Sequence, residues 1–179
     1  MSRSPPFEYY PGPVPTAPEA MTEYLANELY QISLALRPDL VGVTVRNTGT
    51  AAINTTENWQ NLFTGTLAER VRPADSWDSV AGAFTVSQSG LYTLNASLTV
   101  LPFGLGNKQY YVGIRALVDG VVGVTRVTGG DDAMPLSVPL AAEVELESGQ
   151  VLTVEGTAVH DSFAGTVNFD AYWTLGRIG

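Results

Sequence analysis

The chain has 179 residues, of which 45% are hydrophobic and 15% are charged, and its formal net charge at pH 7 is −9. The few Lys and Arg residues are spread along an acidic chain and cannot form a basic surface that neutralises phosphates. Nucleic acid and anionic membranes are therefore not expected partners. The absence of cysteine excludes disulfides, thiolate metal sites and cysteine nucleophiles.

The first predicted element is an extended arm over residues 1–17. It is rich in proline, and because proline fixes φ and lacks an N–H donor, the arm is expected to be neither a helix nor a central strand. Phe7, Tyr9 and Tyr10 lie among the prolines, and aromatic residues on an extended arm favour docking into a groove over a plain flexible tail. The arm lacks the apolar core of a secretory signal, and the chain holds no run of roughly 20 apolar residues, so membrane insertion is not expected.

Residues 18–38 are predicted to form one short α-helix. Pro18 suits its first turn, and Pro38 ends it because proline disfavours helical angles in the residue before it. The apolar residues recur at spacings of four, three and four and make one narrow stripe, namely Leu25, Leu29, Ile32 and Leu36. Two interpretations stay open: the stripe is a seam for self-association or docking, or the helix lies flat on the β domain of its own chain.

Residues 39–179 are predicted to be β throughout. Alternating runs rich in β-branched residues recur at Val41–Arg46, Gly82–Val86, Leu91–Val100, Tyr110–Val118, Val121–Val127, Leu136–Leu146, Val151–Val159 and Thr166–Leu175. Turn residues separate them, at Ser89–Gly90, Gly104–Asn107, Asp119–Gly120, Gly129–Asp132 and Ser148–Gly149. Asp119–Gly120 is the strongest hairpin signal, because both central residues of a type I′ turn need positive φ. About eight strands without an intervening helix predict a sandwich or jelly roll.

Several of these runs resemble the tumour necrosis factor and complement globular-head superfamily. Gly82–Val100 is similar to its signature hairpin, which reads Gly-x-Phe-x-Val, then Gly-x-Tyr, then alternating apolar residues. Val112–Gly120 resembles its hairpin with an Asn-Gly or Asp-Gly turn, and Val144–Val154 its Leu-x-x-Gly-Asp strand pair, with Gln150 where Asp is commoner. The closing strand Val167–Leu175 also matches, so the resemblance covers roughly residues 40–179.

The resemblance implies a ten-stranded jelly roll that packs as a homotrimer, with aromatic and aliphatic residues of one sheet filling a three-fold axis. The low charged fraction fits this expectation, because about 25% is usual for a soluble domain. The aromatic residues of the β domain are therefore expected in the core or at the axis. A subset near loops could instead stack on sugar rings; the full set includes Trp59, Phe63, Trp77, Phe84, Tyr92, Tyr110, Tyr111, Phe169, Tyr172 and Trp173.

The arm and helix depart from the eukaryotic members and look like small phage virion proteins, which attach through the N-terminus and display a trimeric head. This likeness implies a virion protein, a head-decoration or head-fibre trimer anchored to phage capsid proteins through residues 1–37. The alternatives are a tail-attached adaptor or receptor-binding tip, or a soluble lectin-like module that binds a host-surface glycan.

Enzymatic chemistry and cofactors are not expected. His160 is the single histidine, and the chain has no Gly-x-Ser-x-Gly motif, no histidine pair for zinc and no Gly-rich phosphate loop with a lysine. Asp131 and Asp132 could join carbonyl oxygens around calcium, which some relatives bind near the trimer apex. Without an EF-hand spacing, the sequence favours a solvated turn at these two residues.

Overall fold

The computed structural model describes Tyr24 and residues 41–73, 76–102 and 109–178. The chain divides into two units, residues 1–40 and 41–179, and the described residues other than Tyr24 all belong to the second. The predicted anchoring residues Phe7, Tyr9 and Tyr10 and the helix stripe Leu25, Leu29, Ile32 and Leu36 lie outside the described residues. Among the residues that are described, no helix is long and apolar enough to cross a membrane.

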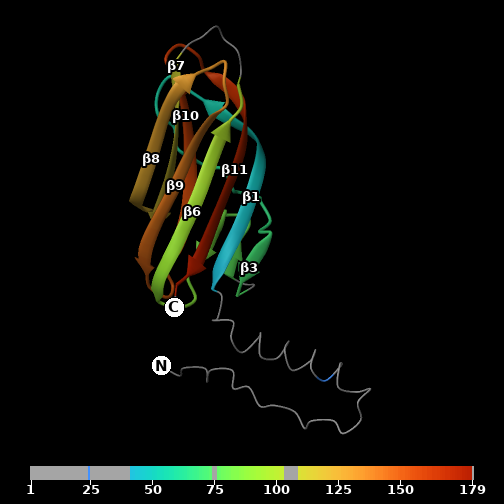
Figure 1. Cartoon of the computed structure of the whole chain (residues 1–179), viewed down its shortest axis with the longest axis vertical. Helices are drawn as coiled ribbons and strands as arrows, with labels where there is room; N and C mark the ends of the chain where they lie inside the picture. Colours follow the sequence, from blue (N-terminus) through green and yellow to red (C-terminus); the bar gives the residue numbers. More distant parts are fainter. Residues whose placement is uncertain (1–23, 25–40, 74–75, 103–108, 179) are drawn as a thin grey trace. The chain divides into compact units, whose positions relative to one another are not determined.

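Residues 41–178 form two antiparallel sheets that pack against each other (Figure 1). The first has the order β3-β1-β11-β6-β9, with bounds Arg70–Arg72, Gly42–Ile53, Gly165–Arg177, Gly90–Val100 and Leu136–Leu146. The second has the order β4-β5-β10-β7-β8, with bounds Trp77–Asp78, Ala83–Thr85, Val151–His160, Gln109–Val118 and Val121–Asp131. A short strand, β2 (Gln60–Asn61), also pairs with β10. The described fold is thus all-β, as the sequence predicts.

Alternation along the strands builds one core between the sheets. In β6 every second side chain from Tyr92 to Val100 is buried, and β11 repeats the pattern from Val167 to Leu175. Because successive strand residues face opposite sides, each of these strands gives one face to the core and one to solvent. Trp173 of β11 is fully buried at the centre of this core, whereas its neighbour Tyr172 is 46% exposed on the other face.

Two strands, β1 and β8, extend well beyond their predicted ends. β1 continues past Arg46 to Ile53 because its polar residues pair with β11 over their whole length, as in Thr50↔Asn168. β8 continues through Gly129 and Gly130, which the sequence analysis had assigned to a turn. That assignment is wrong because both glycines pair with β7, opposite Tyr111 and Tyr110. The turn begins only at Asp132.

The hairpin predicted at Asp119–Gly120 is confirmed. Both residues have positive φ, 51° and 77°, and they join β7 to β8. Asp119 is the one described non-glycine residue with positive φ, and its Oδ1 accepts a hydrogen bond of 2.9 Å from the backbone N–H of Val151. This bond ties the turn to the start of β10.

The long strands give the unit two distinct ends. Gly42 pairs with Gly176 at one end, where the N–H of Arg177 also donates to the carbonyl of Val41 at 3.0 Å. We call this the proximal end, because residues 1–40 join the unit there. At the other end, the distal end, Ile53 pairs with Gly165. The twelve-residue strand β1 separates the two ends by roughly 35–40 Å.

Candidate binding site

A hollow of about 630 Å³ lies at the distal end of the second sheet. Its floor follows the strand register, because Tyr111 of β7 pairs with Val159 of β10 on one side and Gly129 of β8 on the other. The described residues that line it come from four separate stretches of the chain: Thr55, Gln109, Tyr110, Tyr111, Gly129, Gly130, Val159 and Asp161. The hollow thus combines an aromatic residue, two glycines and several polar side chains.

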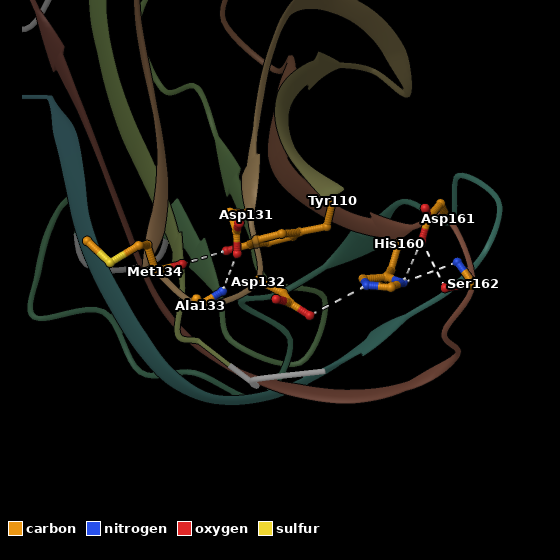
Figure 2. Close-up of polar contacts among 8 residues, drawn as sticks. All are labelled: Tyr110, Asp131, Asp132, Ala133, Met134, His160, Asp161 and Ser162. Carbon is orange, nitrogen blue, oxygen red and sulfur yellow. Dashed lines mark hydrogen bonds and ion pairs between the residues drawn. The ribbon is translucent and has the colours of Figure 1, made fainter. Parts of the chain in front are cut away.

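The carboxylate of the hollow is held in place by its neighbours. Asp161 Oδ1 accepts a hydrogen bond of 2.9 Å from the Ser162 hydroxyl and lies 3.2 Å from His160 Nδ1 (Figure 2). The Asp161 side chain is nevertheless 59% exposed, so it can still meet a ligand. Gln109 and Thr55 are exposed as well and add groups that donate or accept hydrogen bonds.

A buried polar pair lies beside the hollow. His160 ends β10 and is 1% exposed, Asp132 is fully buried, and His160 Nε2 lies 3.9 Å from Asp132 Oδ2 (Figure 2). The backbone N–H of Ser162 lies 3.1 Å from His160 Nδ1, while His160 Nε2 lies on the side of Asp132. Buried polar groups persist only where they are satisfied, so this pair fixes the distal end of β10 against the β8–β9 turn.

The two aspartates considered for calcium have different roles in the turn. Asp131 is exposed, and its Oδ1 accepts from the N–H of Ala133 at 2.8 Å, whereas Asp132 is directed toward His160. The prediction of a solvated turn is therefore wrong for Asp132, because the pairing with His160 draws its carboxyl inward. Among the described residues, no group of three or more His, Cys, Asp or Glu side chains is placed to hold a metal ion.

Tyr110 joins this region to the core. Its ring is buried, and its hydroxyl donates to the carbonyl of Met134 at 3.2 Å. Burial, together with the negative charges of Asp132 and Asp131, raises the pKa of Tyr110 to about 12. The folded protein therefore favours the uncharged hydroxyl of Tyr110 over the charged phenolate.

Alkaline pH is therefore expected to destabilise the protein through Tyr110. The folded-state pKa of about 12 exceeds the ordinary value of 10.0, so the stabilisation is complete below pH 10 and is lost as the pH rises toward and past 12. The shift corresponds to about 2–3 kcal/mol in the free energy of unfolding. Urea unfolding at pH 9 and pH 12 measures this loss, and the Tyr110→Phe variant should lose less stability over the same interval. An equal loss in both proteins would contradict the assignment.

The outward face of the first sheet is a second candidate surface. Tyr172 stands at its centre, level with Ser97 of β6 and Arg46 of β1. The middle of this face carries small, uncharged side chains: Thr44, Thr93, Asn95, Thr99, Ser137, Pro139, Ala141 and Thr174. Arg70 and Arg72 of β3 and Glu143 and Glu145 of β9 lie on the same face toward its two edges, and their charges balance in number. The Arg46 guanidinium pairs with both oxygens of Asp170, at 3.2 and 2.7 Å, so these two charges neutralise each other. We call this the neutral face.

Comparisons with known proteins support the fold. No family model and no curated protein matches the chain. Among solved structures, the globular domain of zebrafish complement 1qA protein has a TM-score of 0.55 at 13% identity, covering 78% of this chain and 98% of that chain. The Eiger TNF of S. frugiperda also has a TM-score of 0.55, at 12% identity, covering 79% of this chain and 94% of that chain. The described unit is therefore a jelly roll of the tumour necrosis factor and complement type.

The structure separates the aromatic residues that the sequence groups together. Tyr92, Trp173 and Tyr110 are core residues, Tyr172 is exposed on the neutral face, and Tyr111 lines the hollow. No sequence motif marks the hollow, because its residues come from distant stretches of the chain. The only local signal was the pair Gly129–Gly130, which is typical of a turn as well.

Proposed function

We propose that this chain is a non-enzymatic homotrimer that serves as the head of a phage virion protein, a head-decoration or head-fibre protein anchored through residues 1–37. The neutral face is the observation that carries the proposal. A strand face with an exposed tyrosine at its centre and few net charges suits burial against further copies of the same face. The low charged fraction of the chain, 15%, agrees with a protein that covers part of its surface in this way.

The two ends of the unit support attachment at one side and display at the other. Residues 1–40 join the jelly roll at Val41, at the proximal end, while the hollow lies at the distal end. A trimer would carry three arms that each bind a capsid protein. Because the arms are tethered to one another, the trimer would bind the capsid more tightly than a single arm. The distal ends would then be free to meet other molecules.

The distal hollow favours a second candidate function, a tail-attached receptor-binding tip or a lectin-like module. The hollow combines the aromatic side chain of Tyr111 with exposed polar groups, as small-ligand pockets do. Fluorescently labelled protein added to separated phage heads and tails distinguishes the locations. Labelling of heads supports the decoration role, and labelling of tails supports the tip.

Several features support a role without catalysis. His160 is buried and its Nδ1 accepts a backbone hydrogen bond, so the ring is not presented to a substrate. Asp161 is the one carboxylate among the described residues that line the hollow, which leaves it without a second acid for paired acid–base chemistry.

Analytical ultracentrifugation tests the trimer directly. Sedimentation equilibrium is expected to give about three times the chain mass of 19.1 kDa, because three neutral faces close around one axis. A mass that stays at 19.1 kDa at every concentration would rule out the proposed assembly.

Removal of residues 1–18 tests the anchor. The shortened protein is expected to remain a folded trimer and to lose binding to particles that lack the protein, measured by co-sedimentation. A full-length variant with Phe7, Tyr9 and Tyr10 replaced by serine is the matched control for arm length. It should also fail to bind, since the aromatic side chains are proposed to dock. Normal assembly of both variants would show that the arm is not the anchor.

A further inference from the structure

Gly129 is a glycine that the fold itself does not require. Its φ is not in the positive range, and a Cβ at this position would meet only the carbonyl oxygen of Tyr110, at an ordinary 3.8 Å. The next residue differs, because a Cβ at Gly130 would lie 2.8 Å from Cδ1 of Leu136. Glycine inside a strand destabilises the fold relative to alanine, because it loses more conformational freedom on folding. A strand glycine without an internal reason often marks a place where another molecule approaches closely.

The space that Gly129 leaves open belongs to the distal hollow. Gly129 pairs with Tyr111, and both residues line the hollow, so the missing side chain exposes the floor beside an aromatic residue. On the adjacent row of the same sheet face the corresponding space is already filled, because Trp59 lies 2.7 Å from where a Cβ of Gly113 would be. The chain therefore covers Gly113 with its own aromatic ring and leaves Gly129, which lines the hollow, uncovered.

We propose that the distal hollow binds a neutral saccharide, with one sugar ring against Tyr111 above Gly129. A pyranose ring has an apolar face of C–H groups that packs on an aromatic side chain, and its hydroxyls both donate and accept hydrogen bonds. Gln109 and Thr55 can do both, and the carboxylate of Asp161 accepts from sugar hydroxyls. The volume of about 630 Å³ lies within the range of small-ligand pockets.

Charge selects a neutral sugar over an anionic one. The described residues that line the hollow include the carboxylate of Asp161 and no Lys or Arg, and the chain carries a net charge of −9. Among these described residues, a phosphate, a sulfate or a sialic acid would meet the carboxylate of Asp161 and no cation.

The buried pair makes the hollow a preformed site. Ser162 is bonded both to His160 and to Asp161, while His160 lies against Asp132, so the carboxylate that faces the ligand rests on a fixed framework (Figure 2). Groups held in place before binding lose less conformational entropy when the ligand arrives. The proposal concerns the single jelly roll and holds for either location on a particle.

The test uses the full chain and two valine variants of the same strand. The probes are methyl glycosides of glucose, galactose, mannose and N-acetylglucosamine, with methyl sialoside as the anionic probe, measured by saturation-transfer NMR and titration. Gly129→Val places a side chain in the hollow, whereas Gly123→Val is the matched control, because a Cβ there is equally free, 3.8 Å from a carbonyl oxygen, and lies outside the hollow. Circular dichroism confirms that both variants fold.

At least one neutral glycoside is expected to bind the natural protein and the Gly123→Val variant alike. Gly129→Val should weaken that binding about tenfold or more. Tyr111→Ala should weaken it as well, because the aromatic surface is lost. Failure of every neutral glycoside, equal binding by the two valine variants, or preference for the sialoside would overturn the proposal. Since the assay uses the isolated protein, its outcome is independent of the particle-binding and mass experiments.

Discussion

Replacement of Tyr172 by glutamate is expected to convert the proposed trimer into folded monomers. The side chain stands at the centre of the neutral face and is 46% exposed in the single chain, so in a trimer it would be buried near the axis. Three carboxylates brought together near the axis would each lose hydration and repel one another, and the neighbouring Arg46 is already paired with Asp170. The sedimentation mass should fall to about the 19.1 kDa of one chain, with an unchanged circular dichroism spectrum.

Two controls make the Tyr172 result specific. Tyr172→Phe keeps the ring and should remain trimeric, while Val127→Glu adds the same charge to the other sheet, where Val127 is 52% exposed, and should also remain trimeric. A Tyr172→Glu protein that still sediments as a trimer would show that the copies meet through another surface. A Val127→Glu protein that dissociates would move the interface to the edge strand β8.

Replacement of Trp173 by alanine is expected to have the largest effect on stability. Trp173 is fully buried, with ring centroids 6.2 Å from Phe63 and 5.8 Å from Trp77, so its loss leaves a cavity between the two sheets. Such truncations cost about 3–5 kcal/mol, a large part of the 5–15 kcal/mol that stabilises a typical domain. Urea unfolding at a fixed chain concentration measures the change in the free energy of unfolding.

Substitution of Trp173 by phenylalanine tests how much of this stability comes from an aromatic ring at that position. Within the described part of the chain, the indole N–H of Trp173 has no hydrogen-bond partner, so Trp173→Phe removes no bond and keeps an aromatic ring. It should cost much less than Trp173→Ala. Trp59→Ala is the surface control, because Trp59 is only half-buried, below the Arg115 guanidinium at 4.5 Å from its ring. Equal losses for Trp59→Ala and Trp173→Ala would contradict the central role of Trp173.

The strands could be predicted from the sequence where alternation is regular. Leu136–Leu146 was predicted with the observed bounds, and the runs around β6, β7 and β10 were placed to within one residue. Polar stretches were harder, because Asn47–Thr50 looks like a loop until β11 supplies its hydrogen bonds. The short strands β2, β3 and β4 are held by pairing with longer strands, and they are too short to show an alternation of polar and apolar residues.

Single residues of the candidate site could be predicted from the sequence, but their arrangement around the hollow could not. Tyr111 was among the aromatic residues considered for sugar stacking, but nothing in the sequence separated it from Tyr110, which faces the core. The alternation of the strand makes that difference, and it shows only once the register is known. Asp132 approaches His160 only because β9 and β10, which lie between them in the sequence, return the chain to the same end of the unit. The sequence alone therefore predicts a solvated carboxyl at Asp132.

The central place of β11 in its sheet has a consequence for synthesis and refolding. β11 pairs with both β1 and β6, so two parts of the first sheet stay unjoined until residues 165–177 have been made. Pairing between segments more than 100 residues apart is slow, because the chain loses loop entropy before it gains contacts. On the ribosome, the edges of β1 and β6 would wait unpaired for the last strand, which makes this step the point where chaperones and aggregation compete with folding.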